Sequence, residues 1–83
     1  MSLTKQHLVD AFNGAKQEDS KYVFVAIKGE GFREVISIPN ESFEAKLNFY
    51  LHAYTDELVH VMNKNIKITG LSHGDESALV ELI

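Results

Sequence analysis

Apolar residues near the start of the chain recur at the spacing of an amphipathic helix. They lie three or four positions apart, so one side of the predicted helix carries Leu8, Ala11, Phe12 and Ala15. Ser2 or Thr4 stands ahead of this run and can cap the first turn. The polar stretch 17–20 follows and is expected to end the helix.

Two strands joined by a tight turn are predicted next. Residues 21–28 are rich in aromatic and β-branched side chains, and both of their alternating sets are apolar. This pattern indicates a central strand or one that is covered on both sides. Gly29 and Gly31 favour a turn, because glycine adopts positive φ at little cost. Residues 32–38 then form the second strand, which completes a β-hairpin.

A second stripe of apolar residues begins after this hairpin. Its members recur at steps of three and four, and they are Phe43, Leu47, Tyr50, Leu51, Tyr54, Leu58 and Val61. With Asn40 as its cap, the stripe predicts one long helix over residues 41–61. An alternative ends the helix near Tyr54 and places a strand over residues 58–62, which contain two β-branched valines.

The last part of the chain predicts one more strand and a short final segment. Residues 66–69 alternate between apolar and polar, which is typical of a half-buried strand. Residues 70–74 are expected to be a loop, and residues 75–83 either a short helix or a frayed tail. The order α-β-β-α-β predicts a single α+β domain over residues 1–83. Its three or four strands form a small antiparallel sheet with helices packed on one face.

The composition of the chain limits the kinds of site and partner that are expected. The chain has 83 residues and no cysteine, which excludes disulfides and thiolate metal sites. Neither an apolar secretory signal nor a bilayer-spanning run is present, so we expect a cytoplasmic protein without a membrane partner. The net charge is −4, and the basic residues are scattered along the chain. Direct binding of nucleic acid, which needs clustered Lys and Arg, is therefore not expected.

The segment 36–70 carries a recognisable packing pattern. Its residues are Ile36, Ile38, Pro39, Asn40, Phe43, Lys46, Leu47, Tyr50, Ala53, Tyr54, Leu58, Ile66, Ile68 and Gly70. This pattern resembles that of small uncharacterised proteins of phages and prophages of Gram-positive bacteria. Asparagine often precedes proline in those proteins, whereas the order is reversed here. The resemblance implies a phage or prophage origin and no particular activity.

Three potential metal ligands lie four positions apart. His52, Asp56 and His60 would share one face of a continuous helix, and such side chains bind zinc or a similar ion. They span about 12 Å, too far for one ion, and the apolar stripe places them toward solvent. A solvated polar face is the favoured interpretation, with no metal or cofactor expected. The alternative is a metal-assisted or acid–base enzyme that uses these three residues.

Spare apolar surface points to a binding protein. The serine, histidine and aspartate within residues 72–75 are too close in sequence to form a triad, so they are interpreted as a turn and a cap. No catalytic residue is therefore predicted. The apolar residues that exceed the needs of a small core are Phe49, Ala53, Leu79, Leu82 and Ile83. The favoured function is a non-enzymatic protein that binds a protein partner or self-associates through these residues.

Overall fold

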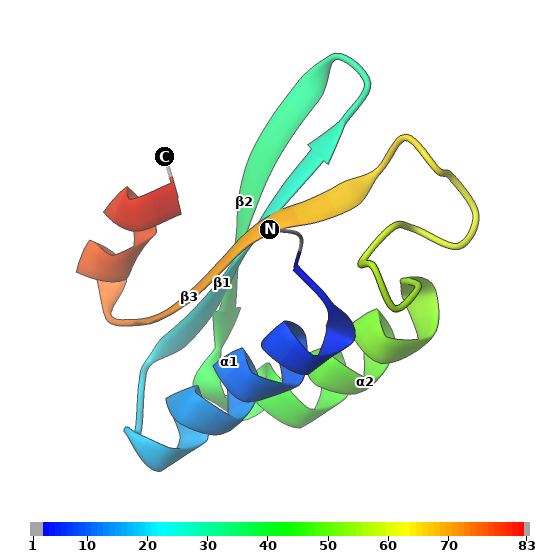
Figure 1. Ribbon diagram of the computed structural model, residues 1–83. Coiled ribbons are helices and arrows are strands. Elements are labelled where there is room, and N and C mark those ends of the chain that lie inside the picture. Colours follow the sequence, from blue (N-terminus) through cyan, green and yellow to red (C-terminus); the bar gives the residue numbers. More distant parts are fainter. Residues whose placement is uncertain (1–2, 83) are drawn as a thin grey trace.

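Three antiparallel strands form a sheet with two α-helices against one face in the computed structural model, which describes residues 3–82 (Figure 1). In chain order the elements are helix α1 (Lys5–Gln17), strands β1 (Tyr22–Gly29) and β2 (Phe32–Pro39), 3-10 helix η1 (Asn40–Ser42), helix α2 (Phe43–Ala53), strand β3 (Lys67–Gly74) and 3-10 helix η2 (Glu76–Leu82). The sheet order is β2-β1-β3, so β1 is central. The predicted α+β class is confirmed.

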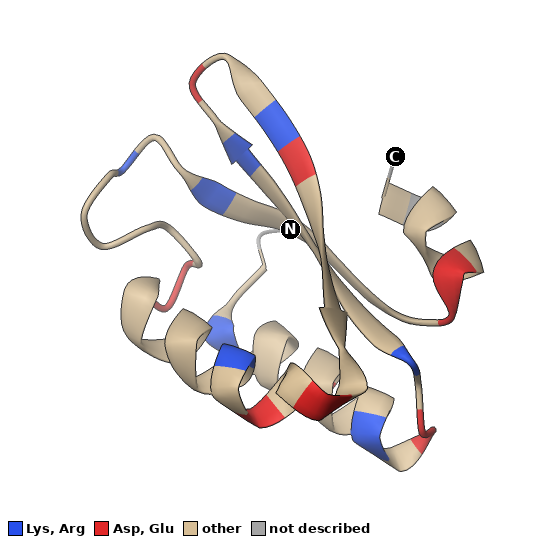
Figure 2. Ribbon diagram, turned by 180° about the vertical axis from the view of Figure 1, so that it is seen from behind, with Lys and Arg blue, Asp and Glu red and all other residues tan. Residues whose placement is uncertain are grey.

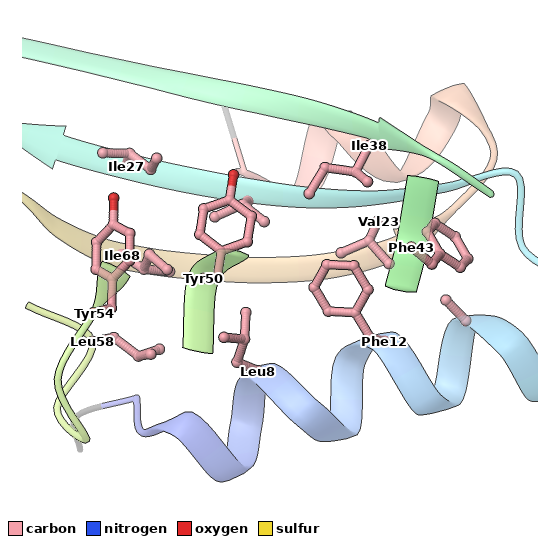
Figure 3. Close-up of a cluster of buried hydrophobic side chains, with 12 residues drawn as sticks. Leu8, Phe12, Val23, Ile27, Ile38, Phe43, Tyr50, Tyr54, Leu58 and Ile68 are labelled. Carbon is pink, nitrogen blue, oxygen red and sulfur yellow. The ribbon is translucent and has the colours of Figure 1, made fainter. Parts of the chain in front are cut away.

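The core lies between the sheet and the two α-helices. Val23, Val25 and Ile27 alternate along β1 and are buried on this face. Pairing continues the face onto the neighbouring strands, with Val23 opposite Ile38 and Ile27 opposite Ile68. The helices and the segment after α2 fill the other side with Leu8, Phe12, Phe43, Tyr50, Tyr54 and Leu58 (Figure 3). This packing is the inward apolar stripe that the sequence predicts.

The opposite face of the sheet is covered in part by η2. Phe24 points to this face and is only 2% exposed, so β1 is covered on both faces at this position, although Lys28 at its end is exposed. Two glycines of β3 let η2 approach closely. A Cβ on Gly70 would lie 2.8 Å from a terminal methyl of Leu82, and a Cβ on Gly74 would lie 3.2 Å from the Cβ of Ala78. The final segment is therefore a docked helix and not a frayed tail.

The beginnings of the two α-helices differ from each other. Thr4 precedes α1 as predicted, and its backbone amide donates to Nδ1 of His7 at 3.0 Å. Asn40 does not cap α2; it begins η1, and Ser42 occupies the capping position. The side-chain amide of Asn40 instead donates to the carbonyl of Ser20 at 3.1 Å. This bond ties the end of the hairpin to the turn before β1.

The long helix predicted over residues 41–61 is wrong. Helix α2 ends at Ala53, Tyr54 is extended, and Leu58 takes a positive φ of 61°. The alternative end of the helix near Tyr54 is therefore confirmed. The chain then folds back through two isolated bridges, Tyr54↔His60 and Val59↔Lys67, so the strand that this alternative placed over residues 58–62 is wrong. The apolar spacing continued past Ala53 because Tyr54 and Leu58 are buried, although they reach the core from a turn.

Strand β3 is longer than its alternating residues predict. It covers Lys67–Gly74, so residues 70–74, which were expected to be a loop, belong to the sheet. Glycine weakens a strand and commonly indicates a loop or a close backbone approach. Here Gly70 and Gly74 serve the second purpose, because η2 occupies the space that their side chains would take.

Candidate functional site

The three potential metal ligands lie apart. His52 is exposed on α2, whereas Asp56 lies in the turn beyond that helix, 4.0 Å from the ammonium of Lys5. His60 packs edge-on against the ring of Tyr54, with centroids 5.2 Å apart. Because α2 ends before Asp56, the shared helical face does not exist. Among residues 3–82, no group of three His, Asp or Glu side chains could hold a metal ion.

A serine, a histidine and a glutamate do meet at the other end of the sheet. Ser20 Oγ lies 3.0 Å from His73 Nδ1, and His73 Nε2 lies 3.5 Å from a carboxylate oxygen of Glu18. The histidine comes from β3, while the other two residues belong to the turn between α1 and β1. Sequence analysis missed this cluster, since its members are far apart in the chain and form no motif.

The geometry of this cluster fits a structural link better than a catalytic triad. A nucleophilic serine must be open to substrate and must lie near donors for an oxyanion. Ser20 is only 8% exposed, and neither the hollow beside Ala26 and Val35 nor the one beside Lys16 and Asn40 is lined by Ser20 or His73. The His73 ring also packs against α1, where a Cβ on Gly14 would lie 3.0 Å from Nε2. The cluster therefore fastens β3 to the turn before β1.

A groove opens on the face of the sheet that η2 only partly covers. It has a volume of about 780 Å³ and runs between η2 and β2, lined by Ala26, Ile27, Arg33, Glu34, Val35, Thr69, Gly70, Leu79 and Leu82. The register places Ala26 between Val35 and Gly70, so small side chains form its floor. Leu79 and Leu82, which the sequence singles out as partner contacts, form its η2 wall.

The outer side of β2 is the open edge of the sheet. All eight residues of β2 pair with β1 in one unbroken register. In contrast, β3 carries an irregularity opposite Ala26 and Ile27, and its outer side is partly occupied, since the amide of Ile68 donates to the carbonyl of Leu58 at 3.0 Å. Within the described residues, no backbone hydrogen bond joins the outer side of β2 to another segment.

Two tyrosines adjoin β2 on the helical face. Burial raises the pKa of Tyr50 to about 12, with smaller contributions from Tyr54 and from the carboxylate of Glu34. Burial, followed by the charge of Glu34, also raises the pKa of Tyr54. Both phenols therefore remain protonated near neutral pH, where they can donate hydrogen bonds but cannot act as bases.

The remaining predicted partner contacts lie elsewhere on the molecule. Phe49 is 55% exposed on α2, under the ammonium of Lys46, which lies 5.6 Å from the ring centroid. Ala53 is half-buried and packs against the core. Ile83 lies outside the described residues. Phe49 and Ala53 are thus separate from Leu79 and Leu82, and the predicted residues do not form one surface.

Comparison with known proteins does not assign the chain to a family. No protein-family model, no curated protein and no solved structure matches the chain. The resemblance of residues 36–70 to phage and prophage proteins therefore stays a prediction. None of the helices in residues 3–82 combines the length and the apolar character needed to cross a bilayer.

Proposed function

We propose that this protein is a non-enzymatic binding module that adds an extended segment of a partner protein to the outer edge of β2. The main support for this proposal is that all eight residues of β2 pair with β1 on one side, while the other side of β2 pairs with no strand of the described residues. An open strand edge presents a row of amides and carbonyls, and an extended peptide pairs with them through its own backbone. Alternate side chains of that peptide would enter the groove between β2 and η2.

The contrast between the two edges supports this proposal. Edges that are not used for pairing are commonly bulged, covered or interrupted by proline. The edge of β3 is both irregular and partly covered by the segment around Leu58. The edge of β2 has its only proline, Pro39, at its last position, and it carries the β-branched residues Val35, Ile36 and Ile38. These residues favour an extended backbone that a second strand can join.

Nuclear magnetic resonance on the full chain tests the proposal with a neutral probe. The probe is an acetylated and amidated hexapeptide of alternating threonine and valine. We expect its titration to shift the amide resonances of Phe32–Pro39 most strongly and to slow the hydrogen exchange of the outward amides there. Shifts centred on another element, or none at saturating peptide, would overturn strand addition at β2.

Charged substitutions on β2 provide the matched test. Val35→Lys introduces a charge at the edge beside the groove and should abolish the shifts. Ser37→Lys introduces the same charge at an exposed position of the same strand and should also abolish the shifts. Agreement between the two variants would show that the result does not come from unfolding of the Val35→Lys variant. Val80→Lys is the control, because this side chain is 71% exposed on η2 and does not line the groove. It should leave peptide binding unchanged.

A further inference from the structure

Three basic side chains form a row across the sheet on the same face as the groove. Lys28 of β1 lies opposite Arg33 of β2 on one side and opposite Lys67 of β3 on the other. Directly opposed residues in antiparallel strands point to the same face, with neighbouring strands about 5 Å apart. All three side chains are exposed. Figure 2 shows blue bands, which mark Lys or Arg, on the strands near the tip of the hairpin.

Among the described side chains, no ion pair joins an acidic group to this row. The ion pairs among residues 3–82 involve other side chains. Glu34 alternates with Arg33 in the register, although it also contributes to the lining of the groove. Glu30 in the hairpin turn accepts a hydrogen bond from Asn65 at 3.3 Å. Like charges that face one another across strands are unfavourable. The row therefore attracts anions, although the chain as a whole carries a net charge of −4.

The row lies at one end of the groove. Arg33 belongs to both, and Val35, the next residue of β2 on the same face, continues the lining toward Leu79 and Leu82. A strand paired with β2 would thus place one side chain beside Arg33 and, two residues along, another beside Val35. We propose that the partner segment carries an acidic residue and an apolar residue two positions apart. This inference rests on the proposed function and specifies the chemistry of its partner.

A second copy of β2 that pairs in the antiparallel direction does not have this chemistry. In any antiparallel register, opposed residues share a face, whereas Arg33 and Glu34 point to opposite faces. Arg33 would therefore face Val35, Ser37 or Arg33 of the other copy, and never Glu34. In antiparallel pairing, the charge complement of the row therefore comes from a different, acidic segment.

Two peptides that differ in one residue test the inference on the full chain. Both are acetylated and amidated Thr-X-Thr-Val-Thr-Val hexapeptides, with X either glutamate or lysine. At low salt, we expect the glutamate peptide to bind about tenfold more tightly, as measured by amide shifts on β2. The difference should largely disappear at about 0.5 M salt, because surface charges are then screened.

Single substitutions assign the preference to the row. Arg33→Gln and Lys28→Gln should each weaken the glutamate peptide by about two- to fivefold and leave the lysine peptide no weaker. Both side chains are exposed, so the fold should be retained, which thermal unfolding checks. Lys46→Gln on α2 is the control and should change neither affinity.

The outcomes separate this inference from the proposed function. If both peptides bind at β2 with equal affinity, strand addition holds but the acidic preference is overturned. If neither binds at β2, strand addition itself fails. If light scattering shows that the free chain dimerises, and a charge at Ser37 abolishes the dimer, a second copy is the occupant and the acidic partner is overturned.

Discussion

Leu58 combines a buried side chain with a left-handed backbone, and two substitutions can separate these effects. Its side chain has no exposed surface, yet its φ is +61°. A non-glycine residue in this region costs roughly 1–2 kcal/mol, because its Cβ crowds the following carbonyl. Leu58→Ala removes most of the buried side chain but keeps the Cβ. Leu58→Gly removes the Cβ as well.

The expected changes in the free energy of unfolding follow from the buried side chain and from the strained backbone. Leu58→Ala should lower the free energy of unfolding by about 3–5 kcal/mol. Relative to alanine, glycine at this position loses about 0.8 kcal/mol of methyl burial. It also loses about 0.4–1 kcal/mol through the entropy of the unfolded chain. The relief of roughly 1–2 kcal/mol of backbone strain offsets both losses. The glycine and alanine variants should therefore be nearly equal in stability.

Leu47 supplies the matched control. It is half-buried in α2, where glycine is about 1 kcal/mol less favourable than alanine and no strain is relieved. The gap between alanine and glycine should therefore be larger at Leu47 than at Leu58, by roughly 1–2 kcal/mol.

Urea unfolding followed by circular dichroism measures all four variants, since the chain has no tryptophan. Trimethylamine oxide in every sample keeps the weaker variants folded at the start of the titration. If glycine is as unfavourable at Leu58 as at Leu47, the left-handed turn costs nothing and the reasoning is refuted.

Two further predictions concern stability. The pKa of Tyr50 is raised from 10.0 to about 12 in the folded state, so the unfolded chain loses its proton first and stability should fall as pH rises across this interval. Tyr50→Phe should make the fall shallower in urea unfolding at a series of pH values, and an unchanged slope would contradict this. Ser20→Ala should cost about 1–2 kcal/mol, because His73 loses a buried partner. Ser77→Ala is the control, because the Ser77 hydroxyl donates to Asp75 at the surface, and it should lower the free energy of unfolding by no more than about 0.5 kcal/mol. Equal losses for the two variants would count against the structural role of Ser20.

Local pattern predicts most of the sheet and of its packing. The two apolar sets of β1 correctly indicate a central strand, because Phe24 needs a cover on the face opposite Val23 and Val25. The stripe that begins at Phe43 correctly marks Phe43, Tyr50, Tyr54 and Leu58 as buried, but its last member, Val61, is 52% exposed. It cannot reveal the path of the backbone, since Leu58 enters the core from a turn that contains no glycine or proline. The favoured prediction therefore extended α2 too far, whereas the alternative end near Tyr54 was right.

The candidate sites depend on contacts that sequence spacing does not encode. Ser20 and His73 are 53 positions apart and meet only because β3 pairs with β1. A hairpin that turns around Gly29 and Gly31 would place Lys28 near Arg33, so part of the basic row was within reach of the sequence. The place of Lys67 in the row could not be predicted in this way, because it depends on the register of β3, which follows α2 in the chain.

The open edge and the basic row have complementary effects on β2. A free edge alone would pair with any extended segment, including another copy of the same strand. The cations of Lys28 and Arg33 oppose strands that place basic side chains against them. The alternation of Arg33 with Glu34 also leaves an antiparallel second copy without a compensating ion pair. The same charges attract a strand with an acid on that face. Selectivity at this edge thus comes from a repulsive element and an attractive one that use the same side chains.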